Sequence, residues 1–169
     1  IRIMGEEMHP DSYHIKQQIG IVLQNVAVFD ELTVYENIDY FCGLYIKDKA
    51  KREQCVQEAI EFTGLEEYTK VRPQKLSGGL LRRLNIACGI AHKPKLIFLD
   101  EPTVGLDIMA VEELKKMMRE YANHGNTVFV TSHNIELVSK ICDRVAIINN
   151  GKVVELFDLN KNPNKRLQL

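Results

Sequence analysis

Short apolar runs alternate with amphipathic stretches along the 169 residues of this chain. The runs at 19–24 (IGIVLQ), 96–99 (LIFL) and 127–131 (TVFVT) have the length and side-chain types of buried strands. Between these runs, apolar residues recur at helical spacing. Strands that alternate with helices indicate an α/β domain with a mainly parallel sheet.

Three helices are predicted between the first and second runs. Thr33 and Glu36 have the spacing of a capping box, which favours a helix start at Thr33. A second helix is expected over 48–63, and a third follows Ser77-Gly78-Gly79. The pattern therefore predicts a helical insertion at about residues 30–90, before the sheet resumes.

Another amphipathic helix is predicted over 111–121, ahead of the 127–131 strand. Near the C-terminus, two apolar runs flank Asn150-Gly151. Both residues accept positive φ, as a tight hairpin turn requires. A chain of this length holds one ordinary core, so we expect a single domain over 1–169.

Composition narrows the range of partners. The chain has 22 basic and 23 acidic residues, and this formal net charge of −1 gives no reason to expect a nucleic acid partner. No apolar stretch approaches the ~18–20 residues of a membrane span. Four scattered cysteines form no C-x-x-C pair, so neither a zinc site nor a disulfide framework is indicated, and a reducing cytoplasmic setting fits.

Polar residues stand at the ends of the predicted strands, where ligands of open α/β sheets gather. Asp100 is suited to hold Mg²⁺ through water, because Mg²⁺ prefers oxygen ligands and keeps part of its hydration shell. Glu101 beside it is the candidate general base that would draw a proton from an attacking water. His133 could donate to a γ-phosphate, and Gln24 could contact both the metal and the water.

Each of these features has a structural alternative. An acid pair after a strand is often a turn with a helix cap, and a lone Ser-His is often structural. Ser77-Gly78-Gly79 can bind an anion with the free N–H groups of a helix start, because glycine permits a close approach of the backbone. The same residues can also form a simple serine cap.

The continuous stretch LSGGLLRRLNIACGIAHKPKLIFLDEPTVGLD (76–107) resembles the signature-to-Walker-B block of ABC transporter ATPases. SGGLLRRL and DEPTVGLD look most like the ATPases of drug or ABC-2-type exporters. The correspondence is Gln24 with the Q-loop glutamine, Leu76-Ser77-Gly78-Gly79 with the signature, Asp100 with the Walker B aspartate, Glu101 with the catalytic glutamate, Gly105-Leu106-Asp107 with the D-loop and His133 with the switch histidine.

The resemblance implies a P-loop NTPase-like ABC ATPase core with a mainly parallel sheet. The helical signature subdomain would cover about 30–90, and the Walker B, D-loop and switch-histidine part about 94–150. ATP and Mg²⁺ are the implied cofactors. The implied nucleotide-binding residues are Gln24, Ser77, Gly78, Gly79 and Asp107, the implied metal residues are Asp100 and Gln24, and the implied catalytic residues are Glu101 and His133.

The resemblance also implies partners. In this family two ATPase domains sandwich ATP head to tail, so Ser77, Gly78 and Gly79 would act on nucleotide held by a second ABC ATPase domain. ATP hydrolysis would drive a transmembrane permease. One cytoplasmic helix of that permease would lie near the Q-loop and the helical insertion. The chain would then be cytoplasmic, and peripheral on the cytoplasmic face of the membrane through that permease.

Two departures from the family pattern stand out. Leu80 replaces the usual glutamine of the signature, which removes polar side-chain contacts and leaves the anion-binding backbone unchanged. More severely, the sequence contains no G-x-x-x-x-G-K-[ST] phosphate loop. We therefore expect an N-terminally incomplete chain, whose missing strands and phosphate loop lie before Ile1 and which does not hydrolyse ATP alone. Sheet edges left exposed by this gap would favour association.

The primary interpretation is an ATP-hydrolysing subunit of an ABC exporter, present as a truncated chain. Two alternatives stay open. One is a non-transport ATPase of the same superfamily, of a ribosome-associated or DNA-repair type. The other is a catalytically silent partner that lends its signature in trans.

Overall fold

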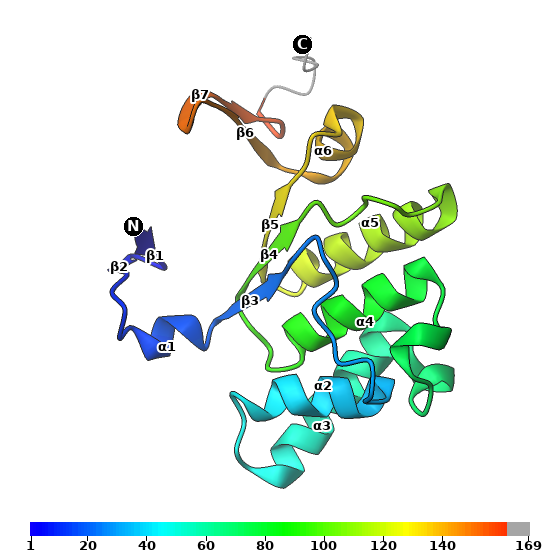
Figure 1. The fold of residues 1–169 in the computed structure, drawn as a ribbon. Coiled ribbons are helices and arrows are strands. Elements are labelled where there is room, and N and C mark those ends of the chain that lie inside the picture. The colour runs from blue at the N-terminus through cyan, green and yellow to red at the C-terminus, as the bar shows by residue number, and fades with distance from the viewer. Residues whose placement is uncertain (162–169) are drawn as a thin grey trace. The chain divides into compact units, whose positions relative to one another are not determined.

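The computed structural model describes residues 1–161 of the chain. It forms two compact units, Ile1–Thr131 and Ser132–Leu169, each of which is described by itself. The predicted α/β class is confirmed, because the first unit combines a parallel sheet with helices (Figure 1). The prediction of one domain over 1–169, with its internal division, stays a prediction.

The first unit contains both strands and helices (Figure 1). Its strands are β1 (Arg2–Ile3), β2 (Glu6–Glu7), β3 (Ile19–Val22), β4 (Leu96–Asp100) and β5 (Thr127–Thr131). Its α-helices are α1 (Tyr13–Lys16), α2 (Val34–Gly43), α3 (Lys49–Thr63), α4 (Gly78–Ile90) and α5 (Ile108–Asn123), with 3-10 turns at Glu66–Tyr68 and Pro73–Lys75. The predicted helical insertion corresponds to α2, α3 and α4.

Strands β3, β4 and β5 form a parallel sheet in that order. Val22 pairs with Leu99, which pairs in turn with Val130. Helices α4 and α5 lie on the same side of the three strands (Figure 1). Gly20, Val22, Ile97 and Leu99 alternate toward that side and are buried, as the two-residue period of a strand requires.

The helix boundaries follow from local capping. Thr33 accepts a hydrogen bond from the Glu36 N–H, and the Glu36 carboxylate accepts one from the Thr33 N–H at 2.8 Å, which confirms the predicted capping box at α2. Asp48 caps α3, and Gly64 ends it with a φ of 64°. These signals are local in sequence, so they were readable without the fold.

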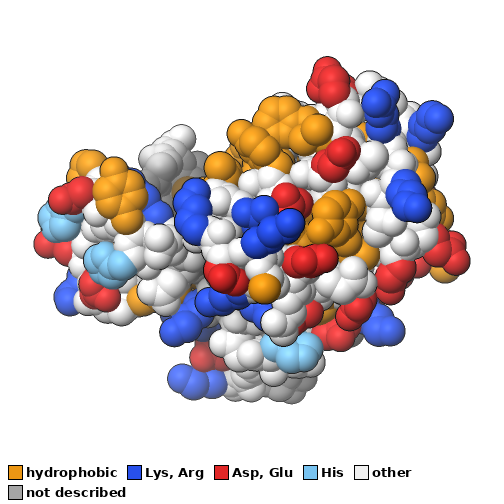
Figure 2. Space-filling model, turned by 90° about the horizontal axis from the view of Figure 1, so that it is seen from below, with side chains coloured by type: hydrophobic (Ala, Val, Ile, Leu, Met, Phe, Trp, Pro, Cys, Tyr) orange, Lys and Arg blue, Asp and Glu red, His pale blue; other side chains and the backbone are white. Residues whose placement is uncertain are grey.

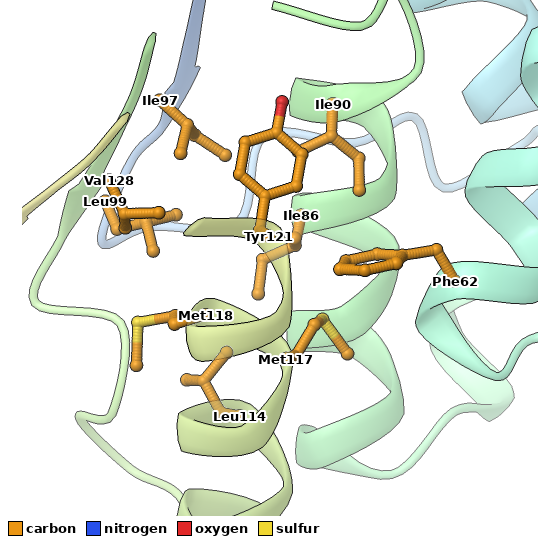
Figure 3. A pocket seen from close by; sticks show the side chains of 10 residues that line it. All are labelled: Phe62, Ile86, Ile90, Ile97, Leu99, Leu114, Met117, Met118, Tyr121 and Val128. Carbon is orange, nitrogen blue, oxygen red and sulfur yellow. The ribbon is translucent and has the colours of Figure 1, made fainter. Parts of the chain in front are cut away.

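The core of the first unit lies between the sheet, α4 and α5 (Figure 3). Tyr121 of α5 reaches across this core, and its hydroxyl donates to the Pro94 carbonyl at 2.6 Å. Burial raises the pKa of Tyr121 to about 12. The space left between the core side chains is about 10 Å³, no more than one water occupies, so this is packed interior and not a ligand pocket. Its lining is Phe62, Ile86, Ile90, Ile97, Leu99, Leu114, Met117, Met118, Tyr121 and Val128 (Figure 3).

The second unit contains α6 (Ile135–Ile141) and the antiparallel pair β6 (Arg144–Asn149) and β7 (Lys152–Asp158). The turn between these strands has φ angles of 50° at Asn150 and 73° at Gly151. The predicted hairpin is therefore confirmed.

Some expectations were inexact. The strand predicted over 19–24 ends at Val22, because the Leu23 and Gln24 carbonyls accept hydrogen bonds from α4 and not from a neighbouring strand. The hairpin β1–β2 and the short helix α1 were not predicted, since they are too brief to show a hydrophobic period. Within residues 1–161, no helix combines the length and the apolar character that crossing a membrane requires.

Candidate functional site

The acid pair lies where β4 leaves the sheet. Asp100 is the last residue of β4 and is exposed, and its Oδ1 accepts a hydrogen bond from the Thr131 hydroxyl at the end of β5. The Glu101 N–H donates to the Thr131 carbonyl and hydroxyl oxygens, each at 3.1 Å. Thr131 thus fixes both acids at the carboxyl edge of the sheet. Sequence reasoning missed this role, although a hydroxyl at the end of an apolar strand was its visible signal.

Glu101 holds an unusual backbone conformation. Its φ of 43° lies in the left-handed region, which costs a non-glycine residue on the order of 1–3 kcal/mol. Its bonds to Thr131 hold it there, and the buried Pro102 follows directly. Neither Asp100 nor Glu101 caps the next helix, because Asp107 does so. The alternative of a simple turn with a helix cap therefore does not describe this pair.

Gln24 follows β3 by two residues and is exposed. Its carbonyl accepts a hydrogen bond from Arg82 of α4 at 2.8 Å, and the Leu23 carbonyl accepts from Arg82 at 3.0 Å and from Asn85 at 3.1 Å. Sequence reasoning missed Arg82 and Asn85. Two polar residues on the sheet-facing side of an otherwise apolar helix were the signal that could have found them.

Ser77, Gly78 and Gly79, here called the Ser77 turn, form the start of α4. The Ser77 side chain accepts from the Leu80 N–H at 3.3 Å, so the predicted serine cap is present. A Cβ on Gly78 would meet no atom within 4 Å, which leaves the backbone open to an approaching group. The first N–H groups of a helix are free to bind an anion, and leucine at position 80 does not change this.

The Ser77 turn and Asp107 meet at the first turn of α5. Asp107 is the N-cap of α5, and its Oδ1 accepts from the Ala110 N–H at 2.9 Å. A Cβ on Gly79 would lie 3.2 Å from the Ala110 Cβ. Both predicted motifs therefore touch the same residue. The Asp107 carboxylate is engaged in capping, and its predicted contact with nucleotide stays a prediction.

Helix α4 runs opposite to the strands. Gly89 near its end packs against Gly20 in β3, whereas Arg82 near its start contacts Leu23 and Gln24, which lie beyond the end of β3. The Ser77 turn is thereby directed toward the edge of the sheet that carries Asp100. The first unit thus gathers the Ser77 turn, Gln24 and the acid pair toward one end.

His133 lies in the second unit, two residues after β5, and is exposed. It sits in a short loop in which the Ser132 hydroxyl accepts from the Asn134 N–H at 3.1 Å, and Asn134 caps α6. Glu101 belongs to the first unit, and the predicted action of His133 together with Glu101 stays a prediction.

The donor set of the first unit fits the implied magnesium ion. No three His, Cys, Asp or Glu side chains converge on one point in residues 1–161, so the described side chains make no dedicated metal cage. Mg²⁺ in phosphoryl-transfer sites uses one or two carboxylates and completes its shell with water and substrate phosphates. Asp100, exposed and oriented by Thr131, offers such a carboxylate, and the Gln24 amide could add an oxygen.

A second cavity lies at the opposite end of the sheet. It measures about 360 Å³ and lies between α3 and the ends of α4 and α5. Lys93 at its rim is paired with Glu58. Because this pair cancels the positive charge, the cavity does not suit a phosphate group. On the face shown in Figure 2, acidic and basic side chains are likewise interspersed, with no area of one sign.

Comparison with known proteins supports the same family. The family model described as "ABC transporter" matches residues 1–104. The linearmycin resistance ATP-binding protein LnrL of Bacillus subtilis (strain 168) is 34% identical over 156 residues, which cover 92% of this chain and 50% of LnrL. The methionine import ATP-binding protein MetN of Carboxydothermus hydrogenoformans is 34% identical over 145 residues, covering 84% of this chain and 42% of MetN.

Among solved structures, cbiO1 from Clostridium perfringens, described as part of the ABC transporter complex cbiONQ, superposes with a TM-score of 0.86 at 26% identity. The match covers 98% of this chain and 68% of cbiO1. The chain spans about half the length of the curated relatives it matches. With the family model matched over more than half of its residues, and with the fold shared, this chain belongs to the ABC transporter family.

Proposed function

We propose that this chain contributes the signature and the water-activating acids of an ABC transporter ATP-binding subunit. The observation that carries the proposal is the direction of α4, which points the Ser77 turn toward the edge of the sheet that bears Asp100 and Glu101. Helix N–H groups would hold phosphate oxygens at one end of this arrangement. At the other end, Asp100 would hold the metal and Glu101 would orient a water.

The roles divide between two nucleotides. Mg²⁺, when bound, would neutralise charge on the transferred phosphoryl group. Glu101 would accept the proton of the attacking water, and its fixed backbone would keep the carboxylate in one place. The Ser77 turn would serve nucleotide held by a second ATPase domain, because the family resemblance implies that two such domains bind ATP head to tail between them. His133 would act from the second unit as donor to the γ-phosphate.

The trans role can be tested by complementation. A full-length relative such as LnrL, with its own signature serine replaced by arginine, would be mixed with this chain and assayed for ATP turnover. We expect turnover to rise with added chain, and Ser77→Arg to remove the rise by blocking the helix start. Ser139→Arg, on exposed α6, is the matched control. Equal turnover with wild-type chain and Ser77→Arg would disprove lending of the signature.

A separate measurement concerns nucleotide binding by the chain itself. Calorimetry with MgATP, using Glu101→Gln to block hydrolysis, should give millimolar binding or none, because no phosphate loop is present in the sequence. Micromolar binding would mean that the remaining residues, or an assembled dimer, rebuild a phosphate site.

We also propose that a permease helix docks on an aromatic cluster made of Phe29, Tyr40 and Phe41. The ring centroids lie 4.9 Å apart for Phe29 and Tyr40 and 5.6 Å apart for Tyr40 and Phe41. Phe29 is 42% exposed and Tyr40 48%, so apolar area is available at this position. The buried Asn37 fixes the loop, since its side chain bonds the Phe29 N–H and carbonyl at 2.8 and 3.0 Å.

Docking predicts that charge at this cluster weakens membrane attachment. Phe29→Glu should lower the fraction of this protein that sediments with permease-containing vesicles, and Tyr13→Glu should not. Tyr13 is the matched control, because it is an exposed aromatic residue on α1. An unchanged fraction for Phe29→Glu would contradict docking at the cluster. On this proposal the chain lies on the cytoplasmic face through its permease.

Export is the proposed direction of transport. The stretch SGGLLRRL resembles exporter ATPases, and LnrL is named for resistance to linearmycin. MetN, by contrast, is named for methionine import. Transport assays in vesicles that contain the permease to which this chain binds would decide the direction, and accumulation of substrate on the ATP side would exclude export.

A further inference from the structure

We propose that Arg82 and Asn85 are positioning residues that fasten the Gln24 segment (residues 23–27) to α4, so that Gln24 and the Ser77 turn move as one body. The mechanical part of this inference concerns residues of the first unit alone. Its functional part rests on the proposed function, in which Gln24 faces the metal and the Ser77 turn faces phosphate.

The clamp consists of four hydrogen bonds across a sequence separation of about sixty residues. Arg82 donates to the Leu23 carbonyl at 3.0 Å and to the Gln24 carbonyl at 2.8 Å. Asn85 donates to the Leu23 carbonyl at 3.1 Å and accepts from the Ala27 N–H at 3.4 Å. Two successive carbonyls held by one planar guanidinium leave the segment little freedom to rotate.

A second contact between β3 and α4 lies nearer the C-terminal end of α4, on the same side of the helix. Residues 82, 85 and 89 are spaced so that they share one helical face. At Gly89 the backbones come close. A Cβ on Gly20 would lie 2.3 Å from the Gly89 carbonyl oxygen, and a Cβ on Gly89 would lie 2.7 Å from Val22 Cγ2. Strand β3 and α4 are therefore in backbone contact. The clamp extends this contact past the end of the strand, to the residues that carry Gln24.

The chemistry of Arg82 is unusual for a purely structural residue. It is 6% exposed, and no carboxylate among residues 1–161 lies within salt-bridge distance. Burial lowers the pKa of its guanidinium from the ordinary value. Burying a charge is costly, and an apolar side chain of similar size often stabilises a fold as well or better. A buried cation paired only with carbonyls is instead suited to holding those carbonyls in one arrangement.

The clamp also connects two proposed contact regions. The Gln24 segment continues into Phe29, which Asn37 anchors to α2, while α4 begins at the Ser77 turn. A displacement of the Phe29 loop by a docked partner would reach the Ser77 turn through the clamp. Without the clamp, the same displacement would be absorbed by bending of the Gln24 segment.

Distance measurement by electron spin resonance tests the mechanical part. Spin labels would be placed at Asn25 and at Lys75, both exposed, through unnatural amino acids because the chain contains four cysteines. We expect one narrow distance distribution for the wild-type chain and a clearly broader one for Arg82→Met. Asn85→Ala is the milder variant, should Arg82→Met fail to fold, and Arg82→Lys should restore part of the narrowing.

The neighbouring arginine supplies the matched control. Arg83 bonds the Thr63 carbonyl and Glu113, and makes no contact with Leu23 or Gln24. Arg83→Gln should therefore keep the narrow distribution, even if it lowers the melting temperature. An unchanged distribution in both Arg82→Met and Asn85→Ala would overturn the clamp.

Turnover tests the functional part. In the complementation assay, Arg82→Met should lower kcat on the order of tenfold with KM for MgATP unchanged, because alignment is lost and binding is not. A broadened distribution with unchanged kcat would overturn the coupling of Gln24 to the Ser77 turn. Absence of turnover with wild-type chain, together with broadening in Arg82→Met, would remove the proposed function and support the clamp as a mechanical device.

Discussion

The two faces of the β3–β4–β5 sheet carry side chains of similar character and differ in what covers them. Toward α4 and α5, Val22 and Leu99 are 1% and 3% exposed. On the opposite face, Ile21 pairs in register with Phe98, which pairs with Phe129, and Ile21 and Phe129 are 63% and 49% exposed. No helix of the first unit covers that row (Figure 1).

The comparison separates packing from composition. Parallel sheets are usually covered on both faces, which is why their strands read as continuous apolar runs. The covered face is fitted so closely that only glycine is accommodated at position 20, whereas the open row presents large apolar groups without a partner layer. Side chains of the same hydrophobic pattern can therefore contribute very different amounts to the free energy of unfolding. Substitutions on the two faces of the sheet should differ in their cost accordingly.

The largest effect is expected for Gly20→Ala on the covered face. The new Cβ would lie 2.3 Å from the Gly89 carbonyl oxygen and 2.9 Å from Pro94 Cγ. Because neither a helix carbonyl nor a proline ring can turn aside, β3 must move away from α4, at a cost of about 3 kcal/mol or more. Urea denaturation followed by circular dichroism measures this loss.

Gly43→Ala is the matched control for that substitution. The atoms nearest to a Cβ at position 43 would belong to the flexible Arg52 side chain, at an ordinary distance of 3.5 Å. Its effect on the free energy of unfolding should stay within about 0.5 kcal/mol. Comparable losses in the two variants would show that close backbone contact is not what limits position 20.

A second pair of substitutions compares the faces directly. Leu99→Ala removes a fully packed side chain and should cost about 3 kcal/mol. Phe129→Ala removes a larger side chain that is already half-exposed, so its cost should be about 1 kcal/mol. The free energies of unfolding in urea give both values. Equal costs would mean that the open row is covered in solution.

Much of the fold was predictable from the sequence, because its signals are local. The capping box depends only on Thr33 and Glu36, and the hairpin turn depends only on Asn150 and Gly151, so each signal lies within a few residues. The strand over 127–131 was likewise predicted with its observed bounds. The apolar runs of the three strands could not reveal which face of the sheet is covered, since a sequence does not distinguish an apolar residue on the covered face from one on the open face.

The candidate site was predictable in its residue types and not in its connections. Arg82 and Leu23 are far apart in sequence, so their contact depends on how α4 docks on β3. The positive φ of Glu101 also depends on Thr131, which comes thirty residues later. Family resemblance could name Glu101 from its motif, but the residues that hold it in place emerge only from the packed sheet.

A pH dependence of stability, of intermediate size, is expected from His92. His92 follows α4, its Nε2 lies 3.0 Å from the Ile19 carbonyl, and its ring stacks on Tyr45 at 3.8 Å. Burial lowers the pKa of His92, and the hydrogen bond to Ile19 opposes this only in part. The unfolded chain then binds a proton more readily than the folded chain, so stability falls as pH drops below about 6.5.

Melting temperatures measured between pH 7.5 and 5 would test this. His92→Gln keeps a donor for the Ile19 carbonyl and removes the titration, so its melting temperature should fall less than that of the wild type over this range. His9→Gln, at an exposed position, should follow the wild type. If His92→Gln retains the full slope, other groups cause the pH dependence.

The smallest effect on stability is expected from Ile21→Thr with Phe129→Thr on the open face. Ile21 is 63% exposed and Phe129 49%, and the strand preference of threonine offsets part of the lost burial, so the free energy of unfolding should fall by no more than the roughly 1 kcal/mol expected for Phe129→Ala. Self-association should nevertheless drop clearly, because an exposed apolar row and a free strand edge favour contact between copies. Sedimentation velocity over a range of concentrations measures this, with Tyr13→Thr, an exposed position outside the sheet, as control. A wild-type chain that stays monomeric at every concentration would show that the open face, although apolar, does not cause self-association. The contrast between the two faces would then concern stability alone.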